Sequence, residues 1–164
     1  MLQLRIALIA AALFILGSGS ADPATAKTVL VTGSSQGHGL AFINDYAERG
    51  WTVIATTRTP STATQLQALA ASFPDVTVEE LDVTDFAEID ALADKYKNTP
   101  IDVLNLNGAI NTFRVGRNTH GETDYAWLEQ VLKTNIVGQL YVSEAFLEHV
   151  AASDQKTIAV MSAV

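Results

Sequence analysis

The sequence predicts an α/β fold, in which a doubly wound parallel sheet carries helices on both faces. Three observations support this prediction. From residue 27 onward, short β-branched runs alternate with longer segments of helical periodicity, as in successive β-α-β units. The 164 residues suit a single domain, and 48% of them are hydrophobic, which is enough for a core. A glycine-containing segment joins the first predicted strand to the first predicted helix.

The amino-terminal part of this domain contains two predicted strands, each followed by a helix. Residues 28–32 form a continuous β-rich run, which is typical of a central strand buried on both faces. A helix is predicted over 40–49, because Gly50 is a common carboxyl-terminal stop, and residues 51–57 form the second strand. A Pro-Ser pair then predicts a second helix over 60–72.

The middle of the domain continues the same alternation. Spaced apolar residues predict a third strand over 76–81, and Asp85 is expected to cap a helix that Pro100 ends. A fourth strand is predicted over 101–106. Residues 107–123 contain Gly, Asn and Arg and predict a long surface loop, and loops of this length are usually functional.

One long helix over 124–150 and a fifth strand over 157–163 complete the chain. The right-handed crossover rule then gives the strand order 3-2-1-4-5. We expect this doubly wound sheet to be truncated after its fifth strand.

The charge of the chain excludes one class of partner. Eighteen acidic residues against ten Lys and Arg give a net charge of -8, so we expect no binding to nucleic acid, which needs clustered basic residues. There is no cysteine, and the three histidines have no metal-ligand spacing, so we expect no disulfide and no metal site. His120 and His149 are predicted to be surface residues.

Residues 1–26 form a leader with the features of a signal peptide. Arg5 precedes the apolar run 6–16, and small residues follow at 17–21. Eleven apolar residues are too few to span a bilayer of about 30 Å comfortably, so we favour a cleaved signal peptide over a membrane-seated anchor. Candidate cleavage sites follow Ala21 and Ala26. The predicted location is therefore periplasmic, secreted or membrane-seated. The alternative is a mis-assigned start codon, with a cytoplasmic protein that begins near Lys27.

The segment between the first strand and the first helix predicts a phosphate site. A phosphate needs a backbone without an obstructing Cβ, and it gains from free N–H groups at a helix amino terminus. Glycine-rich loops have many other causes, but the position between strand and helix favours nucleotide binding. The candidate binding residues are Gly33, Ser34, Ser35, Gln36, Gly37, His38 and Gly39.

The glycine spacing Gly-x-x-x-Gly-x-Gly, together with the order of later landmarks, resembles the short-chain dehydrogenase/reductase family. These landmarks are 81–84 after the third strand, 101–110 around the fourth, Asn135 in the long helix and 158–164 at the end. The resemblance covers 27–164 and implies an incomplete NAD(P)-binding Rossmann domain. Within the family, the chain is most similar to small carbonyl reductases of the C-factor and sniffer type.

The resemblance assigns roles to several further residues. It implies that Asp82 and Val83 meet the adenine ring and that Asn107 and Gly108 lie beside the cofactor. This chain has Leu-Asn-Gly-Ala where the family has Asn-Asn-Ala-Gly, so Asn107 is the secure member of that segment. Asn135 corresponds to a family residue that holds a water in a proton relay, and the alternative is a solvent-facing side chain.

The expected cofactor is NADP, although NAD remains possible. Members of the family that prefer NAD carry an acid at the end of the second strand, where this chain has Thr57 followed by Arg58. A guanidinium group at that position favours the 2′-phosphate of NADP. The alternative is an exposed arginine without a role.

The implied reaction is hydride transfer between a nicotinamide cofactor and a small carbonyl or alcohol substrate. Ser162 is the candidate catalytic serine, although one alignment puts Ala163 at that position instead. The family's Tyr-x-x-x-Lys pair is not found in this chain, so we expect the 164 residues alone to be inactive. A non-catalytic nucleotide-binding module is the alternative. We expect the full-length form to be a homo-oligomer and assign His38 no catalytic role.

Overall fold

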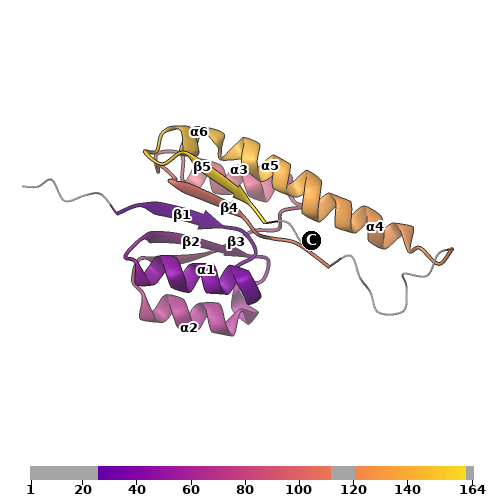
Figure 1. The fold of residues 1–164 in the computed structure, drawn as a ribbon, viewed down its shortest axis with the longest axis horizontal. Helices are drawn as coiled ribbons and strands as arrows, with labels where there is room; N and C mark the ends of the chain where they lie inside the picture. The colour runs from indigo at the N-terminus through magenta and orange to yellow at the C-terminus, as the bar shows by residue number, and fades with distance from the viewer. Residues whose placement is uncertain (1–25, 112–120, 162–164) are drawn as a thin grey trace, which may run out of the picture.

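A computed structural model describes residues 26–111 and 121–161. Its centre is a sheet of five parallel strands in the order β3-β2-β1-β4-β5, which confirms the predicted order (Figure 1). The strands are β1 Thr28–Val31, β2 Thr52–Thr57, β3 Val76–Glu80, β4 Val103–Leu106 and β5 Thr157–Val160.

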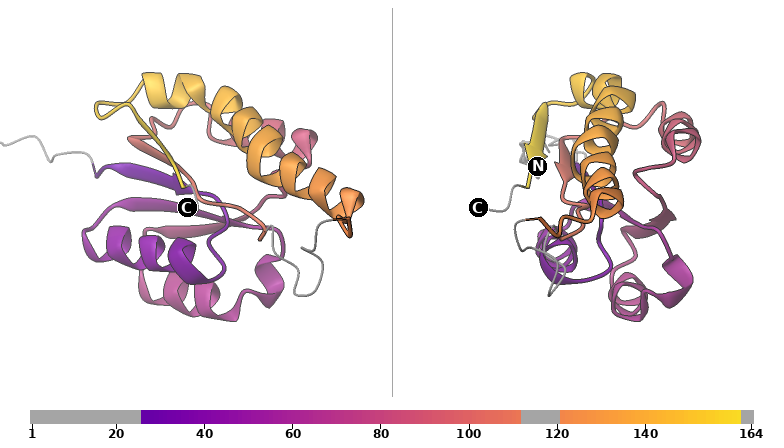
Figure 2. Two further views of the ribbon diagram at one scale, coloured as in Figure 1. Left: turned by 45° about the vertical axis from the view of Figure 1, so that its right-hand side comes forward. Right: turned by 90° about the vertical axis from the view of Figure 1, so that its right-hand side faces the viewer.

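Helices cover both faces of this sheet, as Figures 1 and 2 show. The first face carries α1 (Gly37–Glu48) and α2 (Thr64–Ser72), and the second carries α3 (Phe86–Lys95), α5 (Gln139–Ala145) and α6 (Leu147–Ala151). The alternation of side chains along β1 explains how one strand serves both faces. Val29 and Val31 pack beneath α1, whereas Leu30 packs with the core on the α5 side. The prediction of a strand buried on both faces is confirmed.

Two predicted helix boundaries, the end of α1 at Gly50 and the start of α3 at Asp85, agree with the structure. Gly50, with a φ of +74°, follows α1 in the left-handed conformation. The side chain of Asp85 caps α3 by accepting from the N–H groups of Ala87 and Glu88. The start of α1 was predicted three residues late, because Gly37 and Gly39 lie inside its first turns.

The single helix predicted over 60–72 is wrong. A short 3₁₀ helix covers Pro60–Thr62, and α2 begins only at Thr64. Ala63, which separates them, is buried with a ψ of 62°, outside the helical range. Ala63 packs in the core on the α1 side of the sheet.

The long helix predicted over 124–150 is interrupted. It comprises α4 (Tyr125–Leu132), a π-helical segment (Lys133–Gly138), α5 and α6. At the end of the π-helical segment, a Cβ on Gly138 would collide with the carbonyl oxygen of Val83, so the helix passes close to the connection after β3. At the break between α5 and α6, the side chain of Phe146 is completely buried in the core.

His149 was predicted to be a surface residue, and this is wrong. It is 8% exposed, its ring lies 5.0 Å from that of Phe146, and Nε2 lies 3.0 Å from the carbonyl oxygen of Ala93. Because α6 packs toward α3, a residue at the helix end enters the core. His120, the leader up to residue 25 and Ser162 lie outside the described residues. In the described part of the chain, no helix has both the length and the apolar character required to cross a bilayer.

Candidate functional site

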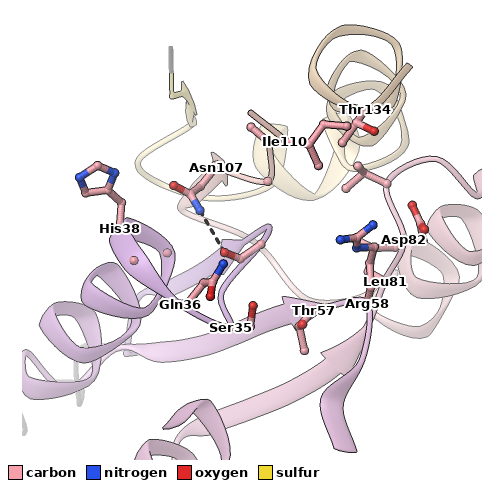
Figure 3. A pocket seen from close by; sticks show the side chains of 16 residues that line it. Ser35, Gln36, His38, Thr57, Arg58, Leu81, Asp82, Asn107, Ile110 and Thr134 are labelled. Carbon is pink, nitrogen blue, oxygen red and sulfur yellow. Dashed lines mark hydrogen bonds between the residues drawn. The ribbon is translucent and has the colours of Figure 1, made fainter. Parts of the chain in front are cut away.

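An open cleft lies at the carboxyl ends of the strands, where the chain connections from β1 and β4 leave the sheet toward opposite faces. Ligands of doubly wound sheets bind at this switch point. The cleft has a volume of about 320 Å³ and is shown in Figure 3. Its lining residues come from the glycine segment, the ends of β2 and β3, the segment after β4 and the π-helical segment: Gly33, Ser35, Gln36, Gly37, His38, Gly39, Thr57, Arg58, Leu81, Asp82, Val83, Asn107, Gly108, Ala109, Ile110 and Thr134.

The three glycines of the motif serve different purposes. Gly33 has a φ of +69°, and a Cβ on it would lie 2.6 Å from the Cα of Gly108, so this position requires glycine for packing. A Cβ on Gly39 would collide with the carbonyl oxygen of Gly33. Gly37 has a φ of +58°, and a Cβ there would meet nothing within 4 Å. Two glycines therefore close the loop, and the third leaves open space in the cleft.

The amino terminus of α1 faces this open space. Gln36 precedes the helix and gives it no side-chain cap, and the first turn contains no acidic residue. The first N–H groups of a helix have no partner inside the helix and carry partial positive charge. The arrangement therefore suits an anion.

Asn107 joins the two sides of the switch point. Its Nδ2 donates to the carbonyl oxygens of Thr32 and Gly33, each at 3.1 Å, and Figure 3 shows this side chain directed at the glycine segment. The segment after β4 is thereby fixed to the turn after β1. Asn107 and Gly108 lie at the cleft as predicted, whereas their contact with a cofactor stays a prediction.

Asn135 does not line the cleft, but it holds a residue that does. Its Oδ1 accepts from the N–H of Ile110 and its Nδ2 donates to the carbonyl oxygen of Ile110, both at 2.9 Å. Its side chain therefore faces the protein rather than solvent, contrary to the alternative considered above. π-helical segments such as the one that contains Asn135 occur frequently at functional sites. The proton-relay role stays a prediction.

Asp82 and Val83 line the cleft beyond β3, as predicted. The Oδ1 of Asp82 accepts from both the N–H and the hydroxyl of Thr84 at 2.8 Å, and the N–H of Asp82 donates to Glu88. These bonds hold the turn in one conformation. Asp82 and Arg58 lie on the opposite side of the cleft from His38, which is exposed at the mouth (Figure 3).

Arg58 lines the cleft next to the buried end of β2. Among the described residues, its guanidinium group makes no hydrogen bond and no ion pair. The group is thus available to an anionic ligand. No set of three His, Asp or Glu residues in the described ranges is placed to hold a metal ion.

Ser34 was predicted to contact the cofactor, and the structure does not support this. Its hydroxyl donates to the carbonyl oxygen of Val31 at 2.8 Å, its N–H donates to Thr56, and its side chain is buried away from the cleft. A serine hydroxyl can close a turn by bonding a nearby backbone group, and Ser34, three residues after the end of β1, does this. Five lining residues were not among the predicted cofactor-binding residues, although Thr57 had been named as the position that distinguishes NAD from NADP. Proximity to the recognised motifs would have found four of them, Thr57, Leu81, Ala109 and Ile110, but not Thr134.

Comparisons with known proteins agree with this arrangement. The family model of the short chain dehydrogenases matches residues 27–164. An NADPH-dependent pterin aldehyde reductase of Arabidopsis thaliana is 30% identical over 149 residues, which cover 88% of this chain and 60% of that protein. The chain spans about half the length of the curated relatives that it matches (55%, 48% and 60% for three of them).

Solved structures of related proteins share a similar percentage of sequence identity with this chain. A short-chain dehydrogenase/reductase of Burkholderia multivorans with bound NADP has a TM-score of 0.71 and 30% identity, covering 84% of this chain and 59% of that one. An NADPH-bound carbonyl reductase from chicken fatty liver also has a TM-score of 0.71, with 31% identity over 80% of this chain and 54% of that one. The family match, the strand order and the glycine segment agree, and the chain therefore belongs to the short-chain dehydrogenase family.

Proposed function

We propose that this chain supplies the cofactor-binding region of an NADP-dependent oxidoreductase that acts on a small carbonyl or alcohol compound. The observation that carries the proposal is the cleft itself, where an uncapped helix amino terminus, open space at Gly37 and the guanidinium group of Arg58, unpaired within the described part of the chain, lie together. The similar structures from Burkholderia multivorans and chicken bind NADP and NADPH, which supports the choice of cofactor.

The residues of the cleft suggest how the dinucleotide would bind. Its pyrophosphate would accept hydrogen bonds from the N–H groups at the start of α1, beside Gly37, where no Cβ obstructs it. The adenosine end would lie toward Asp82 and Val83, and Arg58 would pair with the 2′-phosphate. The bound nicotinamide would supply hydride transfer. The chain's own residues bind and orient the cofactor.

Replacing Arg58 by alanine is expected to weaken NADPH binding about 10- to 100-fold and to leave NADH binding nearly unchanged. A hydrogen bond to a charged group contributes about 1.5–3 kcal/mol, and only NADPH carries the 2′-phosphate. Fluorescence titration of each reduced cofactor measures both affinities. Arg49→Ala is the matched control, because Arg49 is an exposed arginine paired with Asp45 at the far end of α1. Equal losses for the two cofactors would contradict the role of Arg58.

We also propose that residues 1–26 direct the protein out of the cytoplasm as a cleaved signal peptide. Arg5, the apolar run 6–16 and the small residues after it support this. Mass spectrometry of the chain expressed in a bacterium is expected to give a new amino terminus near Asp22 or Lys27. A cytosolic product that retains residues 1–26 would overturn the proposal.

We further propose that the protein self-associates through an apolar stripe that runs along α4, the π-helical segment and α5. Four exposed residues four positions apart form the stripe, and they are between 40% and 58% exposed: Leu128, Leu132, Ile136 and Leu140. In sedimentation velocity, Leu132→Glu is expected to shift a dimer toward monomer, because a charge in an apolar interface is costly. Leu147→Glu, at an exposed residue of α6, is the matched control and should leave the dimer intact. A monomeric unsubstituted chain would reject the proposal.

A further inference from the structure

The carboxamide of Gln139 lies in the interior behind the cleft and does not line it. The residue begins α5, directly after the π-helical segment, and is only 6% exposed. Its Nε2 donates to the carbonyl oxygen of Gly108 and lies 3.4 Å from the carbonyl oxygen of Thr134. Gln139 therefore joins the helix to the segment that follows β4.

A second set of bonds fixes the orientation of this carboxamide. The hydroxyl oxygen of Thr32 accepts from the N–H groups of Asn107 at 3.0 Å and Gly108 at 2.8 Å. Its single proton is then left for the Oε1 of Gln139, 3.3 Å away. The oxygen of the carboxamide thus faces Thr32, and the nitrogen faces Gly108. The N–H and the C=O of Gly108 are both bonded, one by Thr32 and the other by Gln139.

Gly108 has little freedom to move between its neighbours. A Cβ on it would lie 3.2 Å from the hydroxyl oxygen of Thr32 and 3.4 Å from the Nε2 of Gln139. On its other side is the close approach to Gly33 described above. The position of Gly108 therefore sets the distance between the glycine segment and the helix.

Two carboxamides from one helix hold this extended segment. Asn135 binds the backbone of Ile110, and Gln139, four residues later, binds the backbone of Gly108. Gly108, Ile110 and Thr134 all line the cleft, whereas Gln139 does not. Gln139 can therefore affect a ligand only indirectly, through the residues of the cleft that it contacts.

We propose that Gln139 is a positioning residue for the nucleotide site, and that its carboxamide holds Gly108 where the glycine segment and the π-helical segment enclose the cofactor. The inference rests on the proposed cofactor-binding function and adds to it a residue that touches no ligand. Both the oxygen and the nitrogen of the carboxamide form hydrogen bonds. A side chain of equal length that lacks these two atoms therefore cannot hold Gly108 in the same way.

The first test compares Gln139→Met with Gln65→Met, a control on exposed α2, in the 164-residue chain. Met keeps the length of Gln but loses both bonds. We expect Gln139→Met to weaken NADPH binding about tenfold, as coupled positions away from a ligand do. The control should stay within about twofold of the unsubstituted chain, as surface changes generally do. Circular dichroism at the same temperature verifies that each variant is folded.

The second test uses Gln139→Glu, which separates positioning from packing through a pH profile. A protonated Glu can accept from Thr32 and donate to Gly108, as the carboxamide does, whereas a carboxylate opposes the carbonyl oxygen of Gly108. Burial disfavours the charged form and raises the pKa of such a carboxyl group. NADP affinity of this variant should therefore approach that of the unsubstituted chain at low pH and fall as the pH rises. Gln139→Met should show no such recovery. A Gln139→Glu profile parallel to that of the unsubstituted chain would overturn the inference.

A readout without nucleotide distinguishes this inference from the proposed function. In a chain labelled with ¹⁵N-glycine, the amide signals of Gly33 and Gly108 should shift in Gln139→Met and titrate with pH in Gln139→Glu. If the chemical shifts of these two amide signals are unchanged in both variants, the inference is wrong. If these signals change as expected but the unsubstituted chain binds neither NADPH nor NADH, the proposed function fails while the positioning of Gly108 stands.

Discussion

Substituting alanine for Gly39 is expected to destabilise the fold, whereas the same substitution at Gly37 is expected to preserve the fold and weaken nucleotide binding. At Gly39 the added Cβ would collide with the carbonyl oxygen of Gly33 and lie 2.7 Å from the Nδ2 of Asn107. Backbone and a hydrogen-bonded side chain leave little room to relax. Overpacking of this kind costs about 1–3 kcal/mol or more, a large part of the stability of a small domain.

The cost at Gly37 has a different origin. A Cβ there meets no atom within 4 Å, so only the left-handed backbone is strained, by about 1–2 kcal/mol. The methyl group would project into the space proposed for the pyrophosphate. We expect NADPH affinity to fall about 10- to 100-fold, the value of a hydrogen bond to a charged group.

Urea unfolding and NADPH titration measure the two effects separately. The expected result is a lower free energy of unfolding for Gly39→Ala and a selective loss of affinity for Gly37→Ala. Gly50→Ala is the control for backbone strain, because Gly50 also has a positive φ with open space around it but lies at the far end of α1. If Gly37→Ala binds NADPH as well as Gly50→Ala does, the phosphate site is wrongly placed.

The contrast between these glycines shows what the sequence could predict. The alternation of strand and helix patterns, with the right-handed crossover rule, was sufficient to predict the strand order, and the motif placed its glycines correctly at the end of the first strand. The sequence did not predict which glycines are required for packing and which leaves open space. This difference depends on Gly108 and Asn107, which are about 70 residues away in the sequence and adjacent only in the folded sheet.

The π-helical segment was missed for a similar reason. The sequence around it has continuous helical periodicity and no proline, so one uninterrupted helix was the natural prediction. Gly138 is required there because the carbonyl oxygen of Val83 lies close by, a contact between distant elements. Burial of Gln139 and His149 also depends on which neighbouring element faces each helix. Such tertiary contacts override local preference.

The polypeptide of these 164 residues is expected to show no NADPH-dependent reduction of aldehydes or ketones. The reaction implied by the family uses a tyrosine as proton donor, with a lysine that lowers its pKa. None of the four tyrosines, Tyr46, Tyr96, Tyr125 and Tyr141, has a lysine four positions later, and none lines the cleft. Loss of general acid catalysis alone lowers the rate by about 10²–10⁴-fold.

The surroundings of three of these tyrosines raise their pKa values, which is the wrong direction for this chemistry. Burial raises the pKa of Tyr46, and burial together with a hydrogen bond to Glu79 raises that of Tyr96. A hydrogen bond to Asp90 raises the pKa of Tyr141. A raised pKa stabilises the neutral hydroxyl, whereas the reaction needs a tyrosine that exchanges its proton near neutral pH.

His38 is the histidine at the mouth of the cleft, so it provides the critical control. A histidine side chain is a common general acid in catalysis. The assay follows NADPH oxidation with a panel of aldehydes and ketones, using the unsubstituted chain and His38→Gln. We expect both rates to equal that of NADPH without protein. Turnover by the unsubstituted chain would contradict the prediction, and its loss in His38→Gln would identify His38 as the proton donor.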